Sequence, residues 1–390
     1  MTFRRLSPIE HDLGPCYAEL RAIANRRALE RSDLWRRIHA DVERVTSAVE
    51  QGDHEAARAL GPRLRFVAWN VQRGARFDAL AGALRGDPIL SRADVVLLTE
   101  IDCGLGRSAN RNVARELADA LGMSYVFGPS YLTLGDDWGE NQTGAANTLA
   151  LAGTAILTRG SIVHAENVDL PELRDKFSSS ERRLGKKRAL LVDVEHAAGR
   201  LRVGACHLDS NASPGQRARQ LRALLDRIDA GSPASPAILG GDFNSSTHDL
   251  SSPLAMVRDL VGKLVLRGFR RSIDGYMRPD ELDEKPLFEL LAARGFSADR
   301  FNDRTRGSYR FDFNDPYACQ KLRRIGGPGL VWLVRRITRR WNACLPARLD
   351  WFAARGLRAL DATVVDPRDA AGQAVSDHAA VVCDAELPTA

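Results

Sequence analysis

An acid and an amide lie two residues apart where a short apolar run ends. Residues Ala237–Asn244 have the sequence Ala-Ile-Leu-Gly-Gly-Asp-Phe-Asn, so Asp242 and Asn244 follow two glycines. Side chains two apart on an extended segment share a face, so this pair can address one reacting group together. The carboxylate can accept a proton or face a metal ion, and the amide can donate a hydrogen bond. Because ordinary strand exits have similar sequences, the pair needs support from elsewhere in the chain.

Four other apolar runs are joined to polar side chains of the same chemical kind. These side chains are Asn70 after Phe66–Trp69, Glu100 after Val95–Thr99, His207 after Val203–Cys206, and Asp377 with His378 before the last apolar run. One at a time, such residues are typical of solvated turns and caps. Together they favour a site, because the ends of strands are where functional groups gather in α/β folds. We therefore expect the five segments to converge.

The types of these side chains indicate which reaction they would serve. Carboxylates and an amide without thiolates favour a hard cation that keeps several waters, which means Mg²⁺ or Mn²⁺. Such an ion neutralises phosphate charge and polarises a phosphoryl oxygen. The remaining His, Asp and Asn side chains can supply a base and hydrogen-bond donors for attack by water on phosphorus. The pattern thus predicts metal-dependent hydrolysis of a phosphodiester or a phosphomonoester.

The order of the five segments resembles that of the endonuclease/exonuclease/phosphatase superfamily, which includes deoxyribonuclease I, exonuclease III and neutral sphingomyelinases. The segments that carry the resemblance are Trp69-Asn70, Thr99-Glu100, His207-Leu208, Gly241–Asn244 and Ser376–His378. The resemblance covers about residues 64–385. It implies an α/β (α+β) fold, a four-layer sandwich of two mixed β-sheets packed face to face with helices outside.

The resemblance also implies a metal site. Glu100 would be the principal ligand, Asn70 would hold the metal or phosphate beside it, and Asp377 would be a further carboxylate on the metal side. Two positions depart from the family pattern. Gln72 stands where many relatives carry an acid, and Thr154 stands where many have Asn, so this chain lacks one acidic and one phosphate-side contact.

The catalytic roles follow in the same way. Asp242 would orient or deprotonate the attacking water, while Asn244 and His207 would donate to the phosphoryl oxygens as charge builds. His378 would contact the phosphate, with its ring oriented by Asp350, which lies in a segment similar to the family's penultimate strand. A buried carboxylate fixes the tautomer of such a histidine and raises its basicity.

Strands and helices must hold these side chains in place. Apolar residues at spacings of three and four predict a helix from Ser32 to Gly52, and Gly61-Pro62 ends this pattern. We expect an N-terminal helical extension over residues 1–62, either as a cap docked on the main domain or as a dimerisation arm. The catalytic domain would cover residues 63–390, with an insertion at about 246–347.

The composition of the chain limits which class of protein it can be and indicates its compartment. With 390 residues, of which 44% are hydrophobic, the chain can form a large α/β unit with an extension. Six scattered cysteines predict neither a zinc ribbon nor a disulfide framework, and we expect a cytoplasmic protein. No apolar run has the length of a signal-peptide core or a membrane span. The net charge of +6 suits a phosphate-bearing substrate.

Much of the positive charge lies in one stretch of the expected insertion. No acidic residue occurs between Gln320 and Asp350, and the basic residues there are Lys321, Arg323, Arg324, Arg335, Arg336, Arg339, Arg340 and Arg348. Leucine, valine, isoleucine and tryptophan recur at helical spacing, at Leu330, Leu333, Val334, Ile337 and Trp341. This pattern predicts a basic amphipathic helix.

The helix has two interpretations. Its apolar stripe packs against the domain, or the helix serves an anionic lipid surface or a nucleic-acid backbone through Arg335, Arg336, Arg339 and Arg340. The apolar stripe slightly favours lipid over nucleic acid.

A non-catalytic protein that keeps the fold and binds a phosphate-bearing surface is the alternative function. It would require the replacement of an essential position, yet the chain retains Asn70, Glu100, His207, Asp242, Asn244, Asp377 and His378. We therefore favour an enzyme. The sequence leaves its substrate open among nucleic acids, phospholipids and inositol phosphates.

Overall fold

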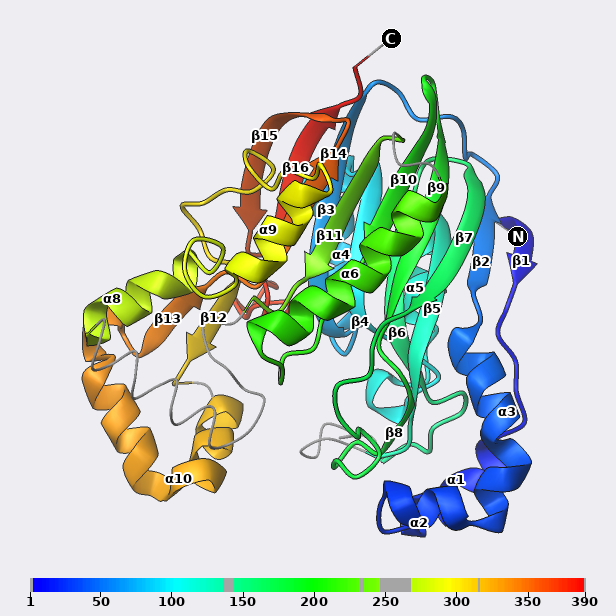
Figure 1. Cartoon of the computed structure of the whole chain (residues 1–390), viewed down its shortest axis with the longest axis vertical. Coiled ribbons are helices and arrows are strands. Elements are labelled where there is room, and N and C mark those ends of the chain that lie inside the picture. The colour runs from blue at the N-terminus through cyan, green and yellow to red at the C-terminus, as the bar shows by residue number, and fades with distance from the viewer. Residues whose placement is uncertain (1–2, 136–143, 232–234, 246–267, 315, 389–390) are drawn as a thin grey trace.

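Two β-sheets packed face to face form the centre of the molecule (Figure 1). The computed structural model describes residues 3–135, 144–231, 235–245, 268–314 and 316–388. In spatial order, the larger sheet contains β1 (Phe3–Ser7), β2 (Glu50–His54), β5 (Ser124–Thr133), β6 (Leu151–Thr158), β4 (Val95–Cys103), β3 (Arg63–Arg73), β16 (Ala380–Glu386) and β15 (Arg358–Val365), with β8 (Arg183–Gly185) paired to β5. The smaller sheet contains β14 (Asp350–Arg355), β11 (Ala237–Asp242), β10 (Gly199–Ala205), β9 (Arg188–His196) and β7 (Ile162–Asp169).

Both sheets are mixed. In the larger sheet β3 and β4 run parallel, and in the smaller sheet β10 and β11 run parallel, while their other neighbours pair antiparallel. Two adjacent parallel strands deliver their carboxyl ends to the same edge of a sheet. The carboxyl ends of β3 and β4 therefore lie at one edge of the larger sheet, and those of β10 and β11 lie at one edge of the smaller sheet.

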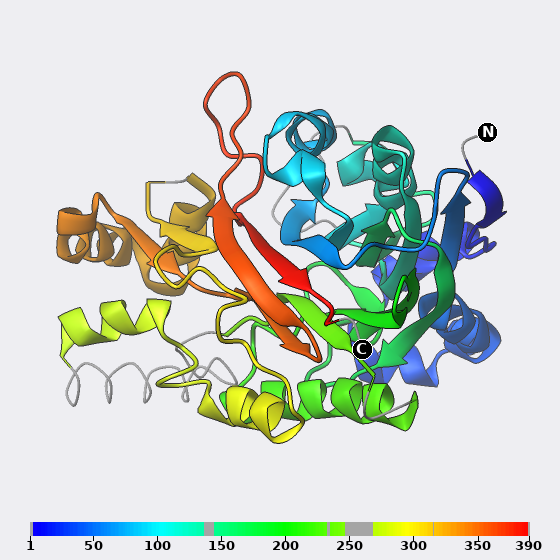
Figure 2. The same ribbon diagram turned by 90° about the horizontal axis from the view of Figure 1, so that it is seen from above.

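Helices cover the outer face of each sheet (Figure 2). Apolar side chains of α3 (Asp33–Ser47), α4 (Phe77–Gly86) and α5 (Val113–Leu121) join the core on the larger sheet. Those of α6 (Pro214–Gly231) and α9 (Lys285–Ala293) join the core on the smaller sheet. A third apolar core fills the space between the sheets. The predicted four-layer sandwich is therefore confirmed.

The N-terminal segment contains strands as well as helices. It forms α1 (Tyr17–Ala22), α2 (Arg26–Arg31) and α3, and Ser32 caps α3 by accepting a hydrogen bond from the Trp35 backbone N–H at 3.1 Å. The helix expected to reach Gly52 ends at Ser47, because Glu50–His54 is strand β2 and pairs with β5. Strand β1 pairs with β2 in turn. The division of the chain at residue 62 stays a proposal.

The expected insertion builds a small hairpin beside the sandwich. Its strands β12 (Tyr309–Asp312) and β13 (Cys344–Ala347) pair antiparallel, and α10 (Pro316–Ile337) connects them. The short helix α8 (Phe269–Asp274) lies on the same side (Figure 1). Residues 246–267 of the insertion lie outside the described residues. Among the helices that the structure does describe, none is both long and apolar enough to span a membrane.

Candidate active site

Two of the predicted site residues lie at bulges inside strands. We expected Asn70 and Glu100 at strand ends, but β3 continues to Arg73 and β4 continues to Cys103. The pairing of β3 with β4 shifts after Asn70, and β4 pairs with β6 through Thr99 and Ile101, which leaves Glu100 out of the ladder with a φ of +56°. A bulge turns a side chain out of the regular alternation. This local backbone geometry, rather than the end of a strand, directs Glu100 into the site.

The other residues do lie at the ends of strands. Asp242 is the last residue of β11, His207 follows β10, and His378 precedes β16. Gly241 has a φ of +127°, and a Cβ atom there would lie 2.3 Å from the Cys206 carbonyl oxygen. Only glycine lets β11 approach the end of β10 this closely.

Asp242 lies at the centre of the group. Its Oδ2 accepts a hydrogen bond from Asn70 Nδ2 at 3.1 Å, and the same amide nitrogen donates to Glu100 Oε1 at 3.2 Å. His207 Nε2 and His378 Nε2 lie 3.6 Å and 4.0 Å from Asp242 Oδ2. The structure therefore brings five predicted residues from five segments together.

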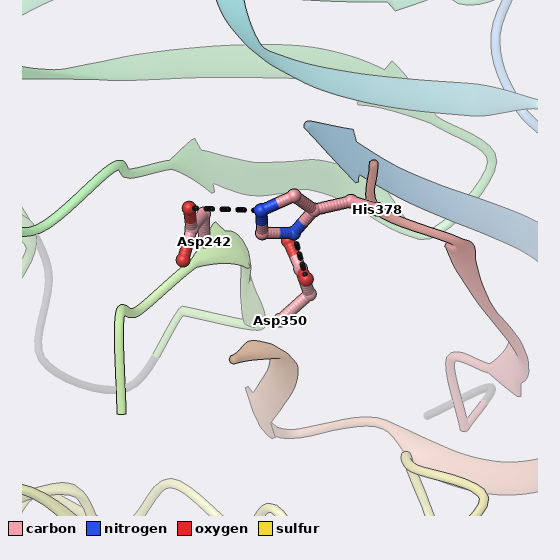
Figure 3. A group of neighbouring side chains, drawn as sticks. All are labelled: Asp242, Asp350 and His378. Atoms are coloured by element: carbon pink, nitrogen blue, oxygen red, sulfur yellow. Dashed lines mark hydrogen bonds and ion pairs between the residues drawn. The ribbon is translucent and has the colours of Figure 1, made fainter. Parts of the chain in front are cut away.

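His378 is held by a buried acid (Figure 3). Its Nδ1 lies 2.7 Å from Oδ2 of Asp350, which is fully buried on β14 next to β11. The resemblance implied this pairing, because Asp350 lies in a segment similar to the family's penultimate strand. Nδ1 therefore carries the proton, and Nε2 is directed at Asp242.

Several supports of His378 were missed by the sequence analysis. Ser376 Oγ donates to the Asn70 carbonyl oxygen at 2.7 Å and accepts the His378 backbone N–H at 3.2 Å. Ser308 Oγ accepts the backbone N–H of Asp350 at 2.9 Å, and the Tyr309 ring packs on the His378 ring with centroids 4.7 Å apart. The last two residues come from the insertion. No motif in the sequence places them near His378, because the contact depends on how the insertion folds back.

Two predicted residues are less engaged with the group. Asn244 donates from Nδ2 to the Leu208 carbonyl oxygen at 2.9 Å, and its backbone N–H donates to Asp242 Oδ1 at 2.8 Å, so it ties the end of β11 to the segment after His207. The Asp377 side chain is exposed, and its Oδ1 accepts a hydrogen bond from Ser376 Oγ at 3.3 Å.

The charges at the site differ from their ordinary values. Burial works against the charge of Glu100, but the neighbouring His207 and Arg73 and the hydrogen bond from Asn70 hold its pKa well below the usual range. Burial, and then the charge of Asp350, raise the pKa of Asp242 to about 7. Glu100 is therefore ionised at neutral pH, whereas Asp242 can take up a proton there.

The two histidines are shifted in opposite directions. Burial disfavours the charge of His378, but the Asp350 carboxylate and its hydrogen bond raise the pKa of His378 well above 6.5. Burial and the ammonium of Lys187 lower the pKa of His207 well below 6.5. At neutral pH the site thus contains one imidazolium and one neutral imidazole.

The oxygen-rich side of the group fits a hard divalent cation. Within the described residues, the ligand atoms of Asp242, Asp350 and His378 lie within 4.8 Å of one another. Because His378 Nδ1 is bonded to Asp350 there, this trio is better suited to hold a proton than an ion. Ionised Glu100 and the amide of Asn70 supply the carboxylate and amide groups that Mg²⁺ and Mn²⁺ prefer.

A basic pocket adjoins this group and was not predicted. It has a volume of about 420 Å³, including the solvent space at its mouth, and Glu100 and His207 line one side. Arg73, Arg183 and Lys187 are among its other lining residues. The signal that could have found it is the segment 181–188, Glu-Arg-Arg-Leu-Gly-Lys-Lys-Arg, which has five basic residues directly before a buried strand.

Comparisons with known proteins identify the family and support the fold. The model of the Endonuclease/Exonuclease/phosphatase family matches residues 67–378. The crystal structure of endonuclease/exonuclease/phosphatase from Beutenbergia cavernae DSM 12333 is 19% identical and has a TM-score of 0.52, with 84% of this chain and 72% of that chain covered.

Two further solved structures are less similar in their overall superposition. D. rerio TDP2 complexed with single strand DNA product is 15% identical, with a TM-score of 0.45 over 83% of this chain and 99% of that chain. The human Nocturnin catalytic domain is 14% identical, with a TM-score of 0.45 over 84% of this chain and 94% of that chain. No curated protein matches the sequence. From the match over most of its length, the chain belongs to the endonuclease/exonuclease/phosphatase family, whose members are generally metal-dependent hydrolases of phosphate esters.

Proposed function

We propose that this protein hydrolyses a phosphodiester or a phosphomonoester by in-line attack of an activated water, with a divalent metal bound. The observation that carries the proposal is the surrounding of Asp242, whose Oδ2 lies within 4.0 Å of nitrogen atoms of Asn70, His207 and His378. A carboxylate among nitrogen donors can hold a water, while the same donors face the oxygens of a phosphoryl group.

Each side chain has a role that its surroundings support. Asp242, with its pKa near 7, accepts the proton of the water. His378, as an imidazolium, faces the negative charge on the phosphoryl group. His207 and Asn244 are neutral groups that hydrogen-bond to its oxygens. Asp350 does not touch the substrate and is a positioning residue that keeps His378 charged and oriented.

Glu100, Asn70 and Asp377 would hold Mg²⁺ or Mn²⁺. When bound, the ion neutralises phosphate charge and polarises a phosphoryl oxygen. The lowered pKa of Glu100 supports this assignment, because an ionised carboxylate is the form that binds a metal. Asp377 is exposed, and the charges of His378 and Glu100 act on its carboxyl group.

Hydrolysis of bis(p-nitrophenyl) phosphate tests the proposal. We expect release of p-nitrophenol with Mg²⁺ or Mn²⁺, loss of the activity in excess chelator, and recovery when metal is restored. Glu100→Gln should weaken metal activation by about a hundredfold or more, because the principal ligand loses its charge. Glu195→Gln is the matched control, since Glu195 is exposed on β9.

Full activity in chelator, with no effect of added metal, would refute the metal requirement. A panel of nucleic acids, phospholipids, inositol phosphates and sugar phosphates then identifies the substrate class. The alternative, a non-catalytic phosphate-binding protein, is supported by no observation in the site. A cytoplasmic location is part of the proposal, because all six cysteines are free.

One surface favours an anionic lipid as the carrier of the ester. We call it the α10 surface and define it by Trp332, Leu333, Arg336, Ile337, Arg339 and Arg340. Trp332 is 64% exposed, Leu333 46% and Ile337 42%, whereas Val331 and Thr338 are buried. Of the two interpretations of this helix, packing of the apolar stripe against the domain is therefore not seen for Leu333 and Ile337. Arg335 is set apart from the α10 surface, because its Nε donates to the Phe313 carbonyl oxygen at 2.7 Å.

The α10 surface is connected to the catalytic group. Helix α10 joins the two strands of the β12–β13 hairpin, and Tyr309 at the start of β12 packs on His378. Figure 1 shows α10 beyond this hairpin, on the side of the sandwich away from α3. Exposed apolar side chains gain by entering the boundary of a bilayer, and the neighbouring arginines attract anionic headgroups. A nucleic-acid backbone would use the arginines alone.

Co-sedimentation with vesicles tests this partner. We expect binding to vesicles of anionic phospholipid, weak binding to neutral ones, and at least a tenfold loss of binding when Arg336, Arg339 and Arg340 are changed to Gln. The matched control changes Arg27, Arg31 and Arg37 to Gln, because these exposed arginines lie on α2 and α3. Equal sedimentation of both variants would leave the α10 surface without a lipid role.

A further inference from the structure

Lys187 is a buried cation, and the carboxylate whose charge acts on it most, Asp209, is itself paired with Lys176 at 2.5 Å. It is 7% exposed, and among the contacts of the described residues its ammonium has no hydrogen bond or ion pair. The preceding Lys186 contacts Asp169 at 2.7 Å and Glu43 at 3.2 Å. Burial lowers the pKa of Lys187 to about 8. An unpaired buried ammonium costs stability, which indicates that an anion is expected beside it.

The ammonium has space in front of it. Lys187 lines the basic pocket together with Arg73 and Arg183, and Glu100 and His207 of the catalytic group line it as well. The pocket is therefore continuous with the place where the scissile phosphate would lie. The pocket is open to solvent, so a phosphate group can approach these cations beside the reacting one.

Positive charge exceeds negative charge in the lining. Arg107 is paired with Asp102 by two hydrogen bonds of 2.8 Å, so these two charges cancel. Glu181 is shared among arginines: its Oε1 lies 3.1 Å from Arg73 and 3.0 Å from Arg107, and its Oε2 contacts Arg183. Glu181 thus offsets one of the two positive charges of Arg73 and Arg183, and Lys187 adds a further charge. Apart from Glu100, which faces the proposed metal, the charged lining residues together with Glu181 have an excess of two positive charges.

The pocket also offers neutral donors of the kind that phosphate needs. The hydroxyl groups of Ser130 and Thr154 belong to residues in its lining, and Tyr131 lies under the guanidinium of Arg183, whose Cζ is 5.4 Å from the ring centroid. Stacking holds the guanidinium in one orientation. Two excess charges with several donors match a dianionic phosphate better than a singly charged carboxylate.

We propose that the basic pocket binds a second phosphate group of the substrate, next to the phosphate that is hydrolysed. This inference rests on the proposed function, because that function assigns the position of the scissile phosphate. It narrows the substrate to phosphate esters with an additional phosphate close to the reacting one. Such a substrate is either a phosphorylated lipid headgroup or a phosphorylated end of a nucleic acid.

Binding of inorganic pyrophosphate to the metal-free protein tests the pocket without any turnover. In excess chelator, calorimetry should show binding to the wild-type protein and at least a tenfold weaker affinity for Lys187→Met. Lys186→Met is the matched control, because it removes the same charge from the adjacent residue, which is directed at Asp169 and Glu43. No binding by the wild-type protein, or equal losses in both variants, would overturn the proposal.

Thermal unfolding separates a binding role from a structural one. Lys187→Met removes an unpaired buried charge and keeps a similar shape, so its Tm should equal or exceed that of the wild-type protein. A lower Tm together with unchanged pyrophosphate affinity would make Lys187 a structural residue. Arg183→Gln is the second variant, since it removes another cation from the lining and should weaken pyrophosphate binding by at least fivefold.

Two pairs of substrates identify the source of the second phosphate. One pair is glycerophosphoinositol with and without a 4-phosphate, and the other is dithymidylate with and without a 5′-phosphate. We expect kcat/KM to favour the more phosphorylated member of one pair by at least tenfold, and Lys187→Met to reduce that preference. Equal turnover within both pairs would refute the inference. If none of the four is hydrolysed while pyrophosphate binding still depends on Lys187, the proposed function fails and the pocket stands.

Discussion

The two histidines beside Asp242 have the same side chain and opposite charges. His207 Nε2 lies 3.6 Å from Asp242 Oδ2, and His378 Nε2 lies 4.0 Å from the same atom. Behind His378 is the carboxylate of Asp350, 2.7 Å from Nδ1, and the pKa of His378 is raised. On the side of His207 is the ammonium of Lys187, which together with burial lowers the pKa of His207.

This difference gives the two histidines different roles toward the phosphoryl group. The His378 ring lies between the carboxyl groups of Asp350 and Asp242 and is protonated. It therefore presents a positive charge to the phosphoryl group. The His207 side is kept neutral by the basic pocket and presents a hydrogen-bonding group without a charge. The catalytic group therefore contains one cationic histidine, His378, and one neutral histidine, His207. The charged residue beside each one, Asp350 or Lys187, determines this difference.

The largest expected effect comes from the acid that both histidines share. Asp242→Asn keeps the shape of the side chain but removes the base, so kcat on the best substrate should fall by about a thousandfold. The KM should change much less. Steady-state kinetics at saturating metal measures both, with Asp299→Asn as a control on an exposed acid. A near-normal kcat would show that Asp242 is not the base.

Replacement of each histidine by Ala and by Gln tests the difference in charge. His207→Ala should lower kcat by about a hundredfold, and His207→Gln should recover about tenfold of that loss, because an amide is a neutral hydrogen-bond donor. His378→Gln should be no better than His378→Ala, since neither supplies a cation. If Gln restored kcat at both positions, or at neither, the two histidines would not differ in the charge that catalysis requires.

Asp350→Asn tests whether the acid acts through His378. The variant should lower kcat by roughly tenfold, because His378 loses the charge that keeps it protonated. The double variant with His378→Ala should be little worse than His378→Ala alone, as expected when one residue acts through the other. Losses that multiply would show that Asp350 has a separate role.

The smallest effect on rate, and a distinct effect on stability, is expected from Lys187. Its pKa is about 8 in the folded protein against an ordinary value of 10.5, so the burial cost is complete below pH 8 and disappears as pH rises toward 10.5. Lys187→Met should therefore be more stable than the wild-type protein at pH 7, by up to roughly 3 kcal/mol, and equal to it above pH 10.5.

Urea unfolding at several pH values measures this difference. Lys186→Met is again the control, and its effect should be small at all pH values because Lys186 forms surface ion pairs. A Lys187→Met variant that is less stable at pH 7 would mean that an anion of the protein itself already compensates the charge.

The order of the catalytic segments could be predicted because each one is local. An apolar run followed by Asn70, Glu100, His207 or Asp242 is visible within a few residues, and the fold that such runs build was predicted from the same segments. The bulges at Asn70 and Glu100 could not be predicted, since they depend on how β4 pairs with β3 and β6. The end of α3 at Ser47 was missed for a similar reason: β2 exists because β5 offers an edge to pair with.

The sequence by itself determined which side chains are available for chemistry and in which order they occur. It also determined the apolar periodicity that makes two covered sheets. Only the tertiary structure decided the charges of these side chains. Ser308 and Tyr309 reach His378 from the insertion, and Lys187 reaches the side of His207 from the start of β9. A pKa depends on distances through space, and residues far apart in the chain become neighbours only when the sheets pack.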